Sequence, residues 1–138
     1  MPGCILRVTG STVGVRAFTA RTSLPVIRVF IKGEPRSPGA RERTRASGFN
    51  VTVSSAPGTD LVRQFRDAQR FMTRHARELR RLTSSFKRAT PVLDFGVSLE
   101  DNPNQYVRSY QLPPAFLKLV GTFGLRVQLS VYPTSEAG

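Results

Sequence analysis

The strongest constraint on the fold is the spacing of apolar residues between Leu61 and Phe86. They recur every three or four positions, which places them on one face of an α-helix. Thr59 or Asp60 supplies an acceptor for the free amides of the first turn. The pattern therefore predicts one long amphipathic helix with a buried face. Its apolar positions are Leu61, Phe65, Ala68, Met72, Ala76, Leu79, Leu82 and Phe86.

A row of arginines lies opposite this apolar face, because each residue turns the helix by about 100°. We call it the arginine ridge; it consists of Arg63, Arg66, Arg70, Arg74, Arg77 and Arg81. A guanidinium group can donate two parallel hydrogen bonds to a phosphate, so this row favours nucleic acid as a binding partner. Charged residues opposite a core stripe are also the ordinary solvated face of such a helix. The ridge has no aromatic platform for unpaired bases and few groups that read base edges.

Six segments have the alternation or the composition of β-strands. The last of them places Leu125, Val127, Leu129 and Val131 on its inner side. Shorter helices are expected at 13–24 and 114–124. The predicted strands cover residues 4–10, 26–32, 49–55, 92–99, 105–112 and 125–133.

Clean alternation of apolar and polar residues is typical of antiparallel sheets with one covered face. The sequence therefore predicts an α+β fold. In it, a mostly antiparallel sheet of about six strands carries the long amphipathic helix and the two short helices on one face. The length of 138 residues fits a single domain over residues 1–138, with a frayed C-terminus at 134–138.

Positive charge is the unusual property of the composition. The chain has 21 lysines and arginines against 9 acidic residues, a net charge of +12. Residues 33–48 are rich in glycine, proline and arginine and predict a basic, mobile loop. Such a charge attracts nucleic acid, anionic lipid or an acidic protein, although compositional bias toward arginine also produces it. The loop contributes Arg36, Arg41, Arg43 and Arg45 to the candidate binding residues.

Residues that could carry catalysis are scarce. His75 is the only histidine, at the edge of the apolar stripe, and packing explains it more simply than proton transfer. Asp94 is the acid most screened from water, and we expect a structural ion pair with an arginine. Cys4 is expected to be a buried, inert thiol. One histidine and one cysteine are too few for zinc, and no glycine-rich phosphate loop occurs. We therefore expect a protein that is not an enzyme, with no metal and no cofactor.

The apolar runs are too short and too often interrupted to cross a bilayer. The first residues lack the pattern of a secretory signal. A lone cysteine agrees with a reducing compartment. We therefore expect a cytoplasmic protein without a membrane partner.

Several short motifs together resemble a known family. They are KGEPR at 32–36, SGFNVTVS at 47–54, LDFGV at 93–97, LPPAFLKLVGTFG at 112–124 and LSVYP at 129–133. The chain resembles a family of small bacterial proteins of uncharacterised function, domain of unknown function family 4279. The resemblance implies a single α+β domain, and partner-binding roles such as toxin neutralisation are suspected for some relatives. The positive charge departs from inhibitors of nucleases, which are usually acidic, and favours an acidic target.

Two functions lead, and a third, an enzyme that uses His75 or Asp94, would need a cleft in which either residue meets a second titratable group. The first is non-catalytic binding of another macromolecule, most plausibly an acidic protein, through the polar sheet face or through the ridge and loop. The alternative is nucleic-acid binding through the arginine ridge, which would weaken steeply with salt.

Overall fold

A computed structural model describes residues 3–99 and 108–133 of the chain. The described elements, in chain order, are β1 (Gly3–Gly10), α1 (Thr12–Arg21), β2 (Val26–Phe30), β3 (Ser47–Ser54), α2 (Leu61–Arg74), α3 (Ala76–Ser85), β4 (Val92–Ser98), α4 (Pro114–Phe123) and β5 (Arg126–Tyr132). The α+β class is therefore confirmed.

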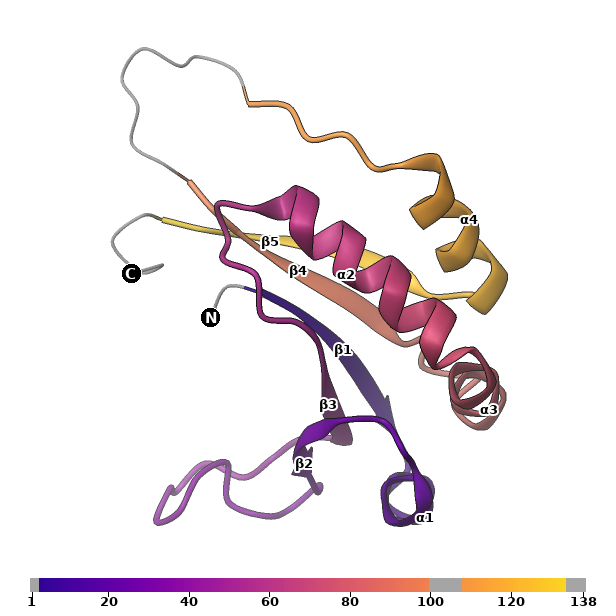
Figure 1. The fold of residues 1–138 in the computed structure, drawn as a ribbon. Helices are drawn as coiled ribbons and strands as arrows, with labels where there is room; N and C mark the ends of the chain where they lie inside the picture. The colour runs from indigo at the N-terminus through magenta and orange to yellow at the C-terminus, as the bar shows by residue number, and fades with distance from the viewer. Residues whose placement is uncertain (1–2, 100–107, 134–138) are drawn as a thin grey trace.

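One sheet runs through the molecule in the order β2-β3-β1-β4-β5 (Figure 1). The pairs β2-β3, β3-β1 and β1-β4 are antiparallel, whereas β4 and β5 are parallel. From β1 to β4, when α2 and α3 are taken together as one broken helix, the order of elements and strands is the β-α-β-β-α-β arrangement called ferredoxin-like. Helix α4 then crosses over the sheet and adds β5 at its edge. This arrangement hosts many functions, so it does not by itself identify one.

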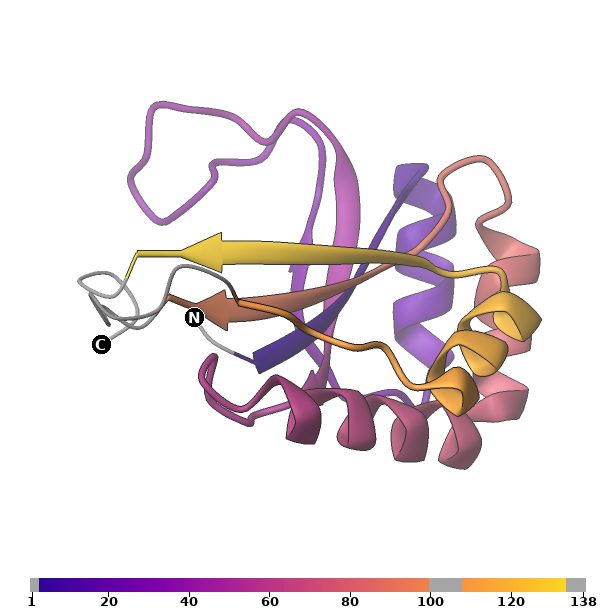
Figure 2. The ribbon, with the colours of Figure 1, turned by 90° about the horizontal axis from the view of Figure 1, so that it is seen from above.

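The helices pack on one face of the sheet and leave the opposite face open, as Figures 1 and 2 show together. Strand alternation supplies the core: in β1, Leu6 and Val8 are fully buried against the helices, while Arg7 between them is exposed. Aromatic rings fill the centre, where Phe65 lies 4.8 Å from Phe95 between ring centroids. The prediction of helices on one face is thus confirmed within the described part.

The predicted single long helix is wrong, because the helix breaks at His75. His75 has φ −107° and ψ 25°, and its amide still donates to the carbonyl of Phe71 as the cap of α2. A straight helix of that length would extend about 39 Å at 1.5 Å per residue. The break instead turns α3 away from the axis of α2 (Figure 1), and Phe86 at its end meets the rings of Phe18 and Phe49.

The predicted strand at 105–112 and the parallel β4-β5 pair are the other differences. Residues 105–107 lie outside the described ranges, together with the proposed turn at 100–104, and residues 108–112 form no strand. The described sheet therefore has five strands and is mixed. The parallel pair follows from the crossover through α4, because a strand entered after such a crossing runs in the same direction as its neighbour. The C-terminus at 134–138 also lies outside the described ranges.

The helix ends follow the local chemistry of the sequence. Asp60 caps α2 by accepting a hydrogen bond from the Arg63 amide at 3.1 Å. Pro114 occupies the first turn of α4, where a missing N–H leaves no bond unmade. Gly124 ends α4 with φ 65°, a conformation that favours glycine.

Candidate anion-binding site

The open face of the sheet and the β2–β3 connection enclose a concave site. Residues 31–46, which we call the arm, are joined by backbone hydrogen bonds: the amide of Gly33 donates to Thr44, and that of Arg36 to Glu42. The Arg28 guanidinium reaches the arm and donates to the Arg36 carbonyl at 3.1 Å. Between arm and sheet lies a cavity of about 760 Å³. The region predicted as a loop at 33–48 is therefore the arm, and β3 already begins at Ser47.

Five arginines line this cavity, which we call the arginine hollow: Arg7, Arg28, Arg36, Arg43 and Arg45. Arg7 projects from β1 because alternation turns it away from the core. Arg28 comes from β2, and the other three come from the arm. Asn50 of β3 lies on the floor, and Phe30 lines one side.

A β-bulge places Arg28 in the hollow. The register of β2 against β3 shifts between Val26 and Arg28, so Val26 pairs with the buried Val51 whereas Arg28 pairs with Asn50. One extra residue on the bulged strand reverses the face on which the following side chains lie. Without the bulge, Arg28 would share the face of Val26.

Positive charge in the hollow exceeds the carboxylates that could balance it. Five arginines face one lining glutamate, Glu42, which pairs with Arg36 at 3.1 Å. Arg7 pairs with Asp94, which lies beneath it in the sheet. Within residues 3–99 and 108–133, Arg28, Arg43 and Arg45 have no carboxylate partner. The uncompensated charge makes the hollow suited to an anion.

Asp94 has the structural role expected from the sequence. Its side chain is 6% exposed, and its Oδ2 accepts from the Nε of Arg7 at 3.0 Å. The Ser130 hydroxyl donates to its Oδ1 at 2.5 Å. Asp94 therefore ties β1, β4 and β5 together and holds Arg7 at the floor of the hollow.

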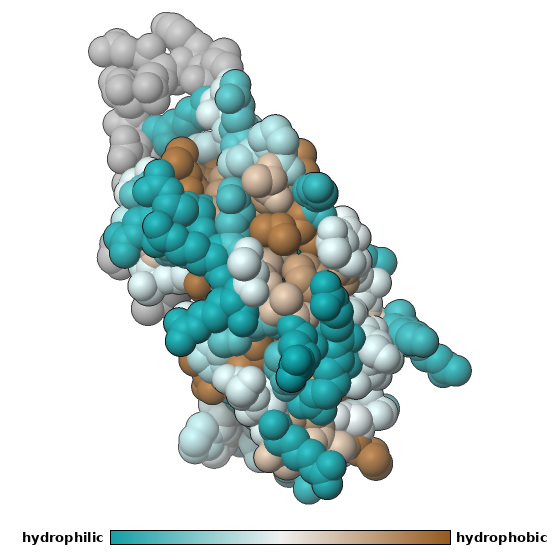
Figure 3. Space-filling model, turned by 45° about the vertical axis from the view of Figure 1, so that its right-hand side comes forward, coloured by the Kyte–Doolittle hydropathy of each residue, from teal (hydrophilic) through white to brown (hydrophobic). Residues whose placement is uncertain are grey.

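The arginine ridge lies along α2 and α3, on the helical side of the sheet, and all six of its residues are exposed. Figure 3 shows hydrophilic side chains standing out on this side, with hydrophobic surface between them. The hollow lies on the opposite face, so the two basic surfaces are separate. Arg41 belongs to the arm but does not line the hollow.

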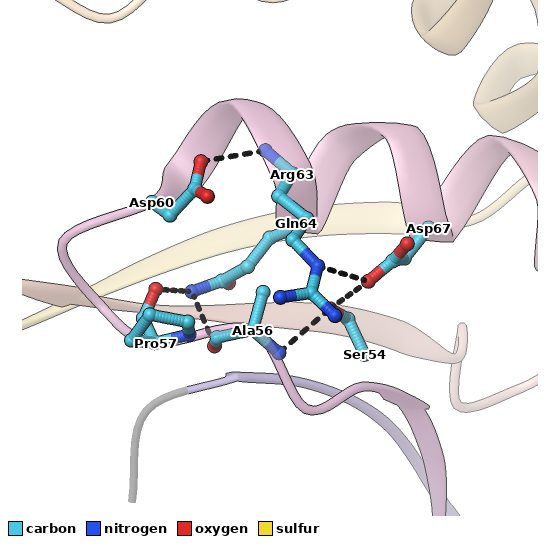
Figure 4. Close-up of polar contacts among 7 residues, drawn as sticks. All are labelled: Ser54, Ala56, Pro57, Asp60, Arg63, Gln64 and Asp67. Carbon is cyan, nitrogen blue, oxygen red and sulfur yellow. Dashed lines mark hydrogen bonds and ion pairs between the residues drawn. The ribbon is translucent and has the colours of Figure 1, made fainter.

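Two of the six ridge residues are partly neutralised. Arg63 lies 3.9 Å from Asp67, at the start of α2, while the neighbouring Gln64 points inward (Figure 4). Arg81 pairs with Glu78 at 2.6 Å and also lies over the ring of Phe18. The remaining four, Arg66, Arg70, Arg74 and Arg77, form no ion pair within the described ranges.

Cys4 and His75 are the other two side chains whose chemistry the sequence singled out. Cys4 is fully buried, as expected. Burial raises the pKa of its thiol, and the charge of Asp94 raises that pKa further. Partial burial lowers the pKa of His75, and the positive charge of Arg74 lowers this pKa further. The negative charge of Glu78 raises it in part. The His75 ring packs on Phe71, with 4.7 Å between centroids.

In the described residues, no three histidine, cysteine or acidic side chains come together as metal ligands. None of the described helices is long and apolar enough to cross a membrane.

Sequence reasoning identified Arg36, Arg43 and Arg45 but missed Arg7 and Arg28. Arg7 was detectable, because alternation already assigned it to the polar face of its strand. Arg28 was not, since its position depends on the bulge. Comparison with models of protein families, with curated proteins and with solved structures finds no match to this chain. The resemblance to domain of unknown function family 4279 stays a prediction.

Proposed function

We propose that this protein is a non-catalytic binding protein whose arginine hollow holds an acidic segment of another protein. The observation that carries the proposal is the convergence of Arg28, Arg43 and Arg45, none of which has a carboxylate partner in the described part of the chain. Guanidinium groups bind carboxylates through paired, charge-assisted hydrogen bonds. An acidic segment supplies the missing carboxylates.

The size of the hollow favours a short segment of a partner as its ligand, rather than a large partner surface. Its volume of about 760 Å³ lies within the range of cavities that enclose a compact ligand. A few side chains of a partner fit such a space, whereas a nucleic-acid duplex contacts a broad exposed surface. The hollow has the arm on one side and the sheet on the other, which favours an extended peptide bound between them.

Matched charge reversals test the proposal. Arg43→Glu with Arg45→Glu changes the hollow, and Arg70→Glu with Arg74→Glu makes the same change of four charges on the ridge. Fluorescence anisotropy of a labelled polyglutamate peptide measures binding. We expect the hollow pair to weaken binding at least about tenfold, which corresponds to about 1.4 kcal/mol. The ridge pair should change it much less, because its charges lie beyond the screening length of about 8 Å at physiological salt.

Circular dichroism checks that both double variants remain folded. Equal losses of peptide affinity in the two double variants would mean that only the total charge of the protein matters, which contradicts a site in the hollow. The same variants, used as baits in a pull-down, separate a partner of the hollow from one of the ridge.

Nucleic-acid binding through the arginine ridge is the second candidate. It is favoured by Arg66, Arg70, Arg74 and Arg77, which are exposed and without an ion pair among the described residues. For a duplex, the affinity should fall with log salt by a slope of about −0.9 per phosphate contact. Reversal of Arg70 and Arg74 should then reduce the slope by about 2, while the hollow pair leaves it unchanged. A slope that is unchanged in the ridge variant contradicts this candidate.

A further inference from the structure

Strand β5 forms one edge of the sheet and leaves apolar side chains uncovered. Leu125 is buried beneath the helices, but Leu129 is 40% exposed and Val131 is 54% exposed on the same side of the strand. Both lie on the inner side, as expected, since they are level with the buried Phe95 and Val97 of β4, but they are not buried because the helical layer covers only the first part of β5. Figure 2 looks down on this edge and shows the ribbon of β5 unobstructed from end to end.

The two edges of the sheet differ in how they are protected. Natural edge strands usually carry a bulge, a central charge or a proline that prevents pairing with another chain. At the opposite edge, β2 has a bulge and places Arg28 at its centre. By contrast, β5 pairs with β4 in unbroken register over seven residues, and its one charged residue, Arg126, lies at its end. Within the part of the chain that the structure describes, the edge formed by β5 is therefore open to a further strand.

The order of residues in β5 is self-complementary about Leu129. When two copies of β5 run antiparallel with Leu129 opposite itself, Val127 of each copy faces Val131 of the other. Gln128 then faces Ser130, which lets an amide meet a hydroxyl on the polar side. Apolar pairs fall together on one face and polar pairs on the other, as stable cross-strand pairing requires.

The ends of this arrangement also match. Arg126 faces Tyr132 of the other copy, so a cation meets an aromatic ring and no two like charges are opposed. A shift of the register by one residue would place Leu129 opposite a polar residue and lose the apolar pairs. Of the antiparallel registers that keep the apolar pairs, the one centred on Leu129 overlaps all seven residues of β5.

We propose that two copies of this protein pair through β5 around a two-fold axis and form a continuous ten-stranded sheet. Such an interface is isologous, since each copy presents the same surface. Arg28 lies on β2 at the opposite edge and Arg7 lies on the central strand β1, both away from β5, so both hollows stay open in the dimer. The proposal does not depend on what the hollow binds.

Charge predicts how the dimer responds to salt. Each copy carries +12, so the two copies repel one another, and salt screens this repulsion. Dimerisation should therefore strengthen between low and high salt, whereas binding of an anion in the hollow should weaken. This opposite response separates the two proposals experimentally.

Analytical ultracentrifugation over a range of protein concentrations tests the association. Wild-type protein should approach twice the chain mass of 15.3 kDa, and more completely at high salt. Leu129→Lys places two like charges opposite each other at the two-fold axis and should give a monomer. Leu117→Lys, at a similarly exposed position on α4, is the matched control and should leave the dimer intact. A monomeric wild type at every concentration and salt overturns the proposal.

Engineered cysteines test the register itself. Residues directly opposite in antiparallel strands have Cα atoms about 4.5–5.5 Å apart, within reach of a disulfide. Leu129→Cys should therefore link two copies under mild oxidation. Val131→Cys should not, because its two copies would be four residues out of step, about 13 Å apart. Cys4 is buried and does not interfere. Equal linkage of the two variants contradicts the proposed register.

Discussion

Replacement of Arg7 by methionine would show how much its contact with Asp94 stabilises the sheet. The substitution keeps an apolar stem of similar reach and removes the guanidinium. The Asp94 carboxylate, 6% exposed, would then keep only the hydrogen bond from Ser130. We expect the variant to fold and to unfold more easily, because a buried charge has lost its main partner.

The magnitude follows from the exposure of the two partners. Exposed ion pairs contribute about 0–1 kcal/mol, and removal of one partner of a fully buried pair costs about 3–5 kcal/mol. Arg7 is 44% exposed while Asp94 is almost covered, so the cost should lie between these limits, at about 2 kcal/mol. For a chain of 138 residues this lowers the melting temperature by about 7 °C.

A double-mutant cycle with Asp94→Asn isolates the pair. Asparagine keeps an acceptor for Ser130 but removes the charge, so Arg7→Met should cost less in this background. Urea denaturation followed by circular dichroism measures all four proteins. We expect a coupling free energy of about 1–2 kcal/mol. A coupling below about 0.5 kcal/mol would refute the reasoning, since the two residues would then act independently.

Three further predictions concern other parts of the molecule. Gly48→Ala should destabilise the fold by about 1–3 kcal/mol in denaturation, because its Cβ would overlap the Val8 carbonyl and the Phe30 ring. Gly121→Ala, in open space on helix α4, should instead stabilise by about 0.5–1 kcal/mol, and the same sign for both would contradict this contrast. Hydrogen bonds from Arg81 and Thr22 lower the pKa of Glu78 below its ordinary value of 4.5. The stability that Glu78 adds should therefore be present above pH 4.5 and be lost as the pH falls through the lowered pKa, so wild type and Glu78→Gln should converge in acid melts. Cys4 should react with a thiol reagent only after unfolding, and fast labelling of native protein would disprove its burial.

Local patterns in the sequence determined much of this protein. The alternation of β1 assigned Leu6 to the core and Arg7 to the polar face, and the spacing of three and four defined the buried side of α2. Asp60 and Gly124 mark helix ends for reasons that involve only their immediate neighbours. These features need no knowledge of distant residues, because side-chain direction repeats with the period of the local backbone.

Other features were decided only by the tertiary structure. The face of Arg28 depends on a bulge against β3, and the hollow depends on the arm folding over β1, which is distant in the chain. The exposure of Leu129 depends on where the helical layer ends. Each of these three features depends on how segments that are distant in the chain pack together. The apolar pattern within one segment does not specify that packing. The sequence therefore showed the excess of arginines that could bind an anion, and only the fold decided which of them share one cavity.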